Sequence, residues 1–132
     1  MANISGEHGI VTVPSPYNVD ESLDRIETSA WSKGMLIFLR LDQQREAEKV
    51  GLTLRPTQLL LFGNPKAGTL LMKASESVAL DLPLKVVAWQ NDQGKVWVSY
   101  NSPDFLRERH QLSEDLVKLV AGIGNLVAEA IR

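Results

Sequence analysis

A helical spacing of apolar residues is the strongest pattern in the first third of the chain. The positions concerned are Val19, Leu23, Ile26 and Ala30. Residues three and four positions apart share one face of a helix, so this segment predicts an amphipathic helix. Asn18 is a suitable N-cap, Glu21 follows three residues later as in a capping box, and Gly34 provides a C-terminal stop.

Five apolar segments are typical of β-strands. They are His8–Val13, Met35–Leu41, Leu59–Phe62, Leu84–Trp89 and Val96–Tyr100. The first ends at two prolines, the second predicts a buried strand, and the third predicts a central strand covered on both sides. The last two predict a hairpin. If Asp92–Gly94 forms a three-residue loop, Trp89 lies opposite Trp97 on one face of the sheet.

Two further segments between these strands are expected to be helical. Gln43–Val50 is polar, lacks helix breakers and ends at Gly51, which indicates a short helix. Thr69–Leu80 fits either one kinked helix or two short ones, with Ser75 as a possible second cap.

The C-terminal part predicts a short helix and then a long one. Ser102 caps the short helix, with Pro103 at its first position. Ser113 caps the long helix, whose apolar stripe comprises Leu116, Leu119, Val120, Ile123, Val127 and Ile131. We interpret Gly122 and Gly124 as positions where another group packs close to the helix backbone, because glycine otherwise costs a helix about 1 kcal/mol.

The order of these elements predicts an α+β fold with a β-α-β-β-β-β-α-like core. The C-terminal hairpin favours a mainly antiparallel sheet backed by helices over a parallel one. With 132 residues, of which 44% are hydrophobic, the chain suits one domain over residues 1–132.

Composition excludes several classes of function. Fourteen basic and sixteen acidic residues give a net charge of −2, and the chain has no run of Lys or Arg, so we expect no nucleic-acid partner. With no cysteine and only two distant histidines, we expect no metal and no cofactor. No apolar run is long enough to span a bilayer, so we expect no membrane partner and a cytoplasmic location.

The segment Gly63–Thr69 is the first candidate for a binding site. It joins a strand to a helix start, where backbone N–H groups and the helix dipole favour an anion, and Asn64 and Lys66 lie within it. It is not a phosphate-binding P-loop, because that motif places Lys directly after the second glycine. A plain strand-to-helix turn remains the alternative.

Four other residues are candidates for the same site or for structural roles. Asp81 and Lys85 either pair across a turn or face a cleft together. Tyr100 ends a strand. His110 is a candidate general base, or alternatively caps the carbonyl groups at the end of its helix.

Several motifs resemble those of domain-of-unknown-function family 302. They are Val50–Met72 (VGLTLRPTQLLLFGNPKAGTLLM), Ala79–Lys85 (ALDLPLK), Val96–Asn101 (VWVSYN), Arg109–His110 and the turn Ser15–Tyr17. The resemblance covers nearly the whole chain and implies a compact α+β domain with a TATA-binding-protein-like layout that tends to form homodimers. It brings no catalytic residue. The resemblance implies an Asp-His pair where this chain has Asp42-Gln43, so a family activity that needs that imidazole is not expected here.

Three hypotheses for function follow, in this order. The first is a small-molecule or anion-binding module whose site combines Asn64, Lys66, Asp81, Lys85, Tyr100 and His110 near the Gly63–Thr69 loop. The second is a homodimeric structural or interaction protein that dimerises through the sheet face or the last helix. The third is a hydrolase-like enzyme with His110 or Asp42 as base and Lys66 stabilising negative charge.

Overall fold

The structure is a computed structural model that describes residues 4–5 and 7–132. Its strands are β1 (Ile4–Ser5), β2 (Ile10–Ser15), β3 (Leu36–Asp42), β4 (Thr57–Gly63), β5 (Leu84–Gln90) and β6 (Val96–Asn101). Its α-helices are α1 (Val19–Ser32), α2 (Gln43–Lys49), α3 (Pro65–Ala74), α4 (Pro103–His110), α5 (Glu114–Val117) and α6 (Ile123–Ala130). Two 3-10 helices, η1 (Glu7–Gly9) and η2 (Glu76–Asp81), complete the order.

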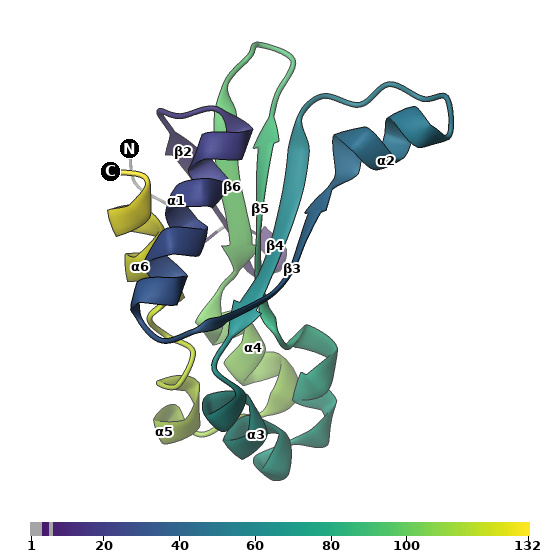
Figure 1. Cartoon of the computed structure of the whole chain (residues 1–132). Helices are drawn as coiled ribbons and strands as arrows, with labels where there is room; N and C mark the ends of the chain where they lie inside the picture. Colours follow the sequence, from purple (N-terminus) through teal and green to yellow (C-terminus); the bar gives the residue numbers. More distant parts are fainter. Residues whose placement is uncertain (1–3, 6) are drawn as a thin grey trace.

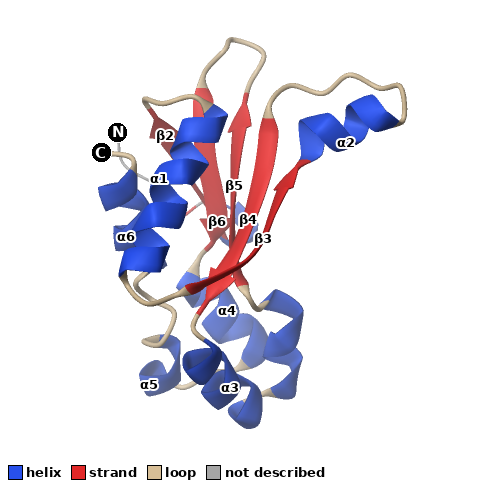
Figure 2. Cartoon of the chain, in the orientation of Figure 1, coloured by secondary structure: helices blue, strands red, loops and turns tan. Residues whose placement is uncertain are grey.

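The strands form one antiparallel sheet in the order β1-β2-β6-β5-β4-β3. Helices α1 and α6 lie on one face of this sheet, while α3, α4 and α5 gather at one end of it and α2 projects at the other (Figures 1 and 2). The predicted α+β class, with an antiparallel sheet backed by helices, is therefore confirmed.

The core lies between the sheet and helices α1 and α6. Leu23 and Ile26 of α1 pack there with alternate residues of the central strands, and all of these side chains are buried: Leu60, Phe62, Val86, Ala88 and Val98. The predicted stripe of α1 is thus its core face. The predicted cap is also present, since Oδ1 of Asn18 accepts a hydrogen bond from Glu21 N at 2.7 Å.

The hairpin has the predicted register. Trp89 pairs with Trp97, with ring centroids 6.4 Å apart and an interplanar angle of 27°. Asn91 N donates to Lys95 O, and Gly94 has the left-handed φ of 80° that a three-residue loop requires.

The predicted strand His8–Val13 corresponds to β2, which begins and ends two residues later. His8 belongs to η1, and β2 continues through Pro14 to Ser15. At Pro14, β2 pairs with β6 on one side. On its other side, within the described part of the chain, β1 reaches only Val11 and Thr12, so Pro14 is at an edge of the sheet. An edge position tolerates proline because no ladder bond is lost there.

The prediction that Met35–Leu41 is a buried strand was wrong. This segment forms β3, the last strand of the sheet, and the side chains of Leu36, Phe38 and Leu39 are 44–49% exposed. The register shifts between Ile37 and Leu39, which marks a β-bulge. An apolar run does not distinguish an edge strand from a central one.

The prediction that β4 is covered on both sides also needs correction. Leu60 and Phe62 are buried under the helices, whereas Leu59 and Leu61 point to the other face and are only half-buried. We call this second surface the open face. It is formed by Leu41, Leu59, Leu61, Val87, Trp89 and Trp97, which the strand register places side by side.

The predicted long C-terminal helix is broken. Ser113 caps α5, which ends at Val117, and a series of turns leads to α6 at Ile123. Of the two glycines, only Gly124 matches the close-packing interpretation, because a Cβ there would lie 3.2 Å from Tyr100 Oη. A Cβ at Gly122 would meet nothing within 4 Å, and this glycine stands where the helix is interrupted.

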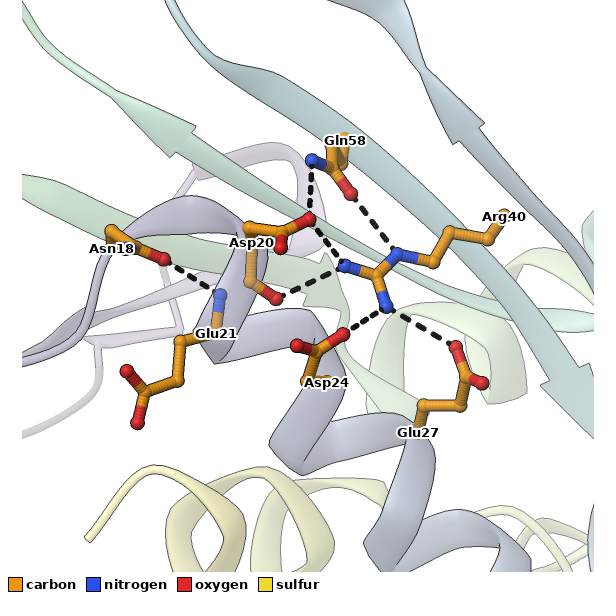
Figure 3. A network of polar contacts seen from close by, with 7 residues as sticks. All are labelled: Asn18, Asp20, Glu21, Asp24, Glu27, Arg40 and Gln58. Carbon is orange, nitrogen blue, oxygen red and sulfur yellow. Dashed lines mark hydrogen bonds and ion pairs between the residues drawn. The ribbon is translucent and has the colours of Figure 1, made fainter.

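Arg40 fastens the edge strand β3 to helix α1 (Figure 3). Its guanidinium donates to Asp24 at 2.6 Å and Glu27 at 3.3 Å through Nη1, and to Asp20 Oδ1 at 3.0 Å through Nη2. Its Nε donates to Gln58 on β4. Burial lowers the pKa of Arg40, but the adjacent carboxylates outweigh this effect and raise the pKa above its ordinary value.

Candidate functional site

An apolar pocket lies where the sheet meets α3; Figure 1 shows α3 below the lower end of the sheet. The volume of the pocket is about 360 Å³. The lining comes from the end of β4 and α3, from η2 and the segment that leads to the start of β5, from β3 and the residue before it, and from the turns before α6: Met35, Phe38, Gly63, Asn64, Pro65, Ala67, Gly68, Thr69, Met72, Ala79, Leu82, Pro83, Leu84, Leu119 and Val120. The Gly63–Thr69 segment singled out from the sequence therefore borders a real cavity.

The start of α3 follows from its local sequence. Asn64 caps the helix, and its Oδ1 accepts hydrogen bonds from Lys66 N at 2.9 Å and Ala67 N at 3.4 Å. Pro65 occupies the first helical position, where its missing N–H costs no hydrogen bond. The helix thus begins at Pro65 rather than at Thr69, and the asparagine side chain uses two of the backbone donors expected to face an anion.

Residues 69–80 follow the second of the two sequence-based alternatives. The chain forms two helices, α3 and η2, which meet at Ser75. Ser75 makes no side-chain cap hydrogen bond to η2; its hydroxyl instead donates to the carbonyl oxygen of His110 at 3.0 Å. The hydroxyl of Ser75, rather than the imidazole of His110, therefore caps a carbonyl group at the end of α4.

The structure places the six predicted site residues in different surroundings. Asn64 lines the apolar pocket, and Lys66 is exposed in the first turn of α3. Tyr100 is buried, with its hydroxyl beside Gly124 of α6. Only Asp81, Lys85 and His110 come together, at the junction of η2, β5 and α4.

Lys85 does not form the side-chain ion pair with Asp81 that we considered. Its Nζ donates to the backbone oxygens of Pro83 at 2.8 Å and Asp81 at 3.3 Å. Burial lowers the pKa of Lys85, and the negative charge of Asp81 opposes that shift only in part.

The carboxylate of Asp81 instead binds two side chains of α4. Its Oδ2 lies 2.5 Å from His110 Nε2, and Arg109 Nη1 lies 3.2 Å from each of its oxygens. On the other side of the ring, His110 Nδ1 lies 2.7 Å from Ser77 Oγ. His110 is buried, whereas Ser77 is exposed.

Nothing in the local sequence marks Ser77 as a candidate site residue. It lies 33 residues from His110 along the chain, and only the packing of η2 against α4 brings the two together. Asp42, the other candidate base, has a structural role, because its Oδ1 accepts from Arg45 N and caps α2.

Besides the pocket and the open face, a further group of exposed apolar residues lies at the other end of the sheet. Helix α2 has no buried residue, and the segment after it exposes Val50 to 71%, Leu52 to 65% and Leu54 to 41%. We call Gln43–Leu54 the arm. It extends away from the helices that cover the sheet (Figure 1).

Two features are absent from the described part of the chain. No group of three or more His, Cys, Asp and Glu side chains there is placed to hold a metal ion. No helix in it has the length and apolar character needed to cross a membrane.

Comparison with known proteins identifies a family and a fold. Residues 11–130 match the model of the family described as Domain of unknown function DUF302. A crystal structure of an uncharacterized conserved DUF302 protein from Bacillus stearothermophilus has a TM-score of 0.77 over 93% of this chain and 95% of that one, at 21% identity.

Longer relatives occur in Brucella. Proteins named fluoride-specific ion channel FluC 1 from Brucella suis biovar 1 (strain 1330) and Brucella abortus biovar 1 (strain 9-941) are both 41% identical over 134 residues. The match covers 98% of this chain but only 52% and 49% of those proteins. The chain therefore spans about half the length of these relatives.

Proposed function

Given that the chain belongs to the DUF302 family, whose description assigns no function, we propose that it binds a small, mainly apolar molecule in the pocket beside Gly63–Thr69. The observation that carries this proposal is the pocket's lining. A volume of about 360 Å³ is within the usual range for small-molecule sites, which are mostly apolar with a few polar groups. Here Asn64 and Thr69 are the polar groups, and Met35 and Met72 are side chains that adapt readily to a ligand's shape.

The lining favours a neutral ligand over the anion first considered. Among the described residues that line the pocket, none is Lys or Arg. An anion that entered it would lose its hydration without gaining a cationic partner, and burying an unpaired charge is costly. Channel activity is not part of this proposal, because the channel names belong to relatives about twice as long as the shared region.

Calorimetric titration with indole and 1-octanol, and with octanoate as the anionic counterpart of the alcohol, tests this proposal. We expect the neutral compounds to bind and octanoate to bind more weakly. A ligand at 100 times its dissociation constant stabilises the folded state by about 2.7 kcal/mol, which a thermal shift detects.

A pocket-filling variant makes the test specific. A Cβ at Gly68 would lie 3.8 Å from Leu82 Cδ1 and 3.9 Å from Met72 Cε, so Gly68→Leu extends into the pocket. We expect it to abolish binding, while Lys73→Leu, on the exposed side of the same helix, leaves binding intact. Equal binding by wild type and Gly68→Leu contradicts the site. Lys66→Leu tests the anion hypothesis separately. If Lys66 binds an anion, this variant should weaken the binding of octanoate but not that of indole or 1-octanol.

We further propose that the chain forms a homodimer, as the family resemblance implies, and that it lies in the cytoplasm. The half-buried apolar side chains of the open face and the exposed leucines and valine of the arm support the homodimer, because apolar surface left uncovered by the chain itself marks interaction sites. A stable interface needs about 1,000 Å² or more, and a two-fold axis lets one copy's face bury its partner's.

Sedimentation velocity tests the homodimer. We expect a dimer that Leu61→Asp on the open face converts to monomer, while Leu80→Asp, an exposed leucine on η2, has no effect. A wild-type monomer at high micromolar concentration contradicts the dimer.

A further inference from the structure

The cluster of Ser77, His110 and Asp81 is not part of the apolar pocket, and its geometry bears on a different activity. The three side chains form a continuous hydrogen-bonded row, with Ser77 Oγ 2.7 Å from Nδ1 and Asp81 Oδ2 2.5 Å from Nε2 of the same ring. An alcohol, an imidazole and a carboxylate in this order are the groups that activate a serine nucleophile.

We propose that Ser77 is a nucleophile activated by His110, and that the protein hydrolyses small activated carboxylic esters at this serine. The proposal is independent of ligand binding in the apolar pocket.

The hydrogen bonds determine which ring nitrogen acts as the base. A carboxylate only accepts hydrogen bonds, so the proton of a neutral His110 lies on Nε2 and is donated to Asp81. Nδ1 is then the acceptor and faces the hydroxyl of Ser77. The two nitrogens are exchanged relative to the serine proteases, but each partner keeps its role.

Surrounding contacts hold this row in place and leave its reactive end accessible. Arg109 Nη1 contacts both oxygens of Asp81 and keeps the carboxylate oriented toward the ring. Ser75 Oγ donates to the carbonyl of His110 and so ties the end of α4 to η2. His110 is buried and Asp81 nearly so, whereas Ser77 is exposed to solvent and therefore to a substrate.

The reaction is balanced without a cofactor. Ser77 Oγ bonds to the ester carbonyl carbon while its proton passes to His110 Nδ1; the bond to the leaving alcohol then breaks, and Nδ1 returns the proton to that oxygen. Water attacks the resulting Ser77 ester by the same route, which releases the acid and restores the hydroxyl. Asp81 is a positioning residue in this scheme, because it acts through the ring.

Labelling of the full chain with a fluorophosphonate probe, read by intact mass, and release of 4-nitrophenol from 4-nitrophenyl acetate test the proposal. We expect one adduct, located on Ser77, and a rate of nitrophenol release that falls about 100-fold or more in Ser77→Ala, because this variant loses the nucleophile together with its proton transfer to His110, and such a transfer alone contributes about 100-fold or more. Ser32→Ala is the matched control, since it removes another exposed serine hydroxyl, one that donates to Ser29 O at the end of α1 and takes no part in the row.

Two further variants separate catalysis from folding. Asp81→Asn is expected to lower the rate at an unchanged near-ultraviolet circular dichroism spectrum, and Asp81→Glu is expected to restore part of it. An absent adduct on the wild-type protein, an adduct elsewhere, or equal rates for wild type and Ser77→Ala each overturn the proposal. Because Ser77 is exposed, Ser77→Ala should fold normally, so loss of the rate reports on the hydroxyl itself.

Discussion

The two faces of the sheet are made from the same strands and nearly the same kinds of residue, yet they end in different environments. Leu60, Val86 and Val98 lie under α1 and α6 and are almost completely buried. Their neighbours Leu59, Val87 and Trp97 point to the open face and stay half-exposed. Apolar residues on a strand therefore indicate a surface that tends to be covered. Where the chain's own helices do not cover it, a partner or ligand can.

The largest expected difference between the faces concerns two adjacent leucines of β4. Leu60→Ala should lower the free energy of unfolding by about 2–5 kcal/mol, because it leaves a cavity in the sealed core. Leu59→Ala should cost less than half as much at protein concentrations where the chain is monomeric. Urea unfolding measures both, and equal losses would mean that the open face is covered within a single chain.

A smaller effect is expected where the helix-covered face meets the edge strand. Arg40→Met removes three ion pairs to α1 and leaves Asp20, Asp24 and Glu27 to repel one another. We expect a loss of about 1 kcal/mol, since the carboxylates are exposed and such pairs are individually weak. Arg45→Met on the exposed arm is the control. The loss should shrink in 1 M salt, and an unchanged loss there contradicts an electrostatic origin.

On the open face, the contact between the two indole rings should contribute even less to the free energy of unfolding. A double-mutant cycle of Trp89→Leu and Trp97→Leu measures their coupling, which we expect to be about 0.5 kcal/mol for stacked rings at this separation. Trp89 Nε1 also donates to Ser99 Oγ, so Trp89→Leu alone should cost more than Trp97→Leu. A coupling of zero would show that the rings are merely neighbours.

The smallest effect is a slope of stability with pH that we expect from Lys85, which the strand register places opposite Leu61 of the open face. Burial lowers the pKa of Lys85 in the folded state below its ordinary value of 10.5. Between that lowered pKa and 10.5 the unfolded state binds more protons, so this residue makes the folded state relatively more stable as pH rises. The unfolding free energy of wild type minus that of Lys85→Met should therefore increase from neutral pH toward pH 10. A constant difference contradicts the shift.

Most of the fold could be predicted from local signals in the sequence. The caps at Asn18, Ser102 and Ser113 and the register of Trp89 with Trp97 depend on neighbouring residues, and all are present. What failed depended on tertiary context. Met35–Leu41 has the same apolar character as β4, and only the strand order makes it an edge.

The candidate site shows the same division. The Gly63–Thr69 turn was found because glycine, asparagine and proline punctuate the chain, but its apolar pocket is completed by Phe38, Leu82 and Val120 from distant segments. Asp81 and His110 were both predicted as site residues, but their mutual hydrogen bond was not. Both this bond and the contact of Ser77 with the other ring nitrogen of His110 depend on the packing of η2 against α4.

The bulge in β3 opposes open-ended strand addition at the edge of the sheet. A long, regular and apolar outer strand is a template on which foreign strands add without limit, as in fibrils. The register shift between Ile37 and Leu39 interrupts the even spacing of donors and acceptors that such growth requires. Removing Phe38 to straighten this strand would therefore be expected to make the protein more prone to fibril formation, even though one exposed aromatic residue has been deleted.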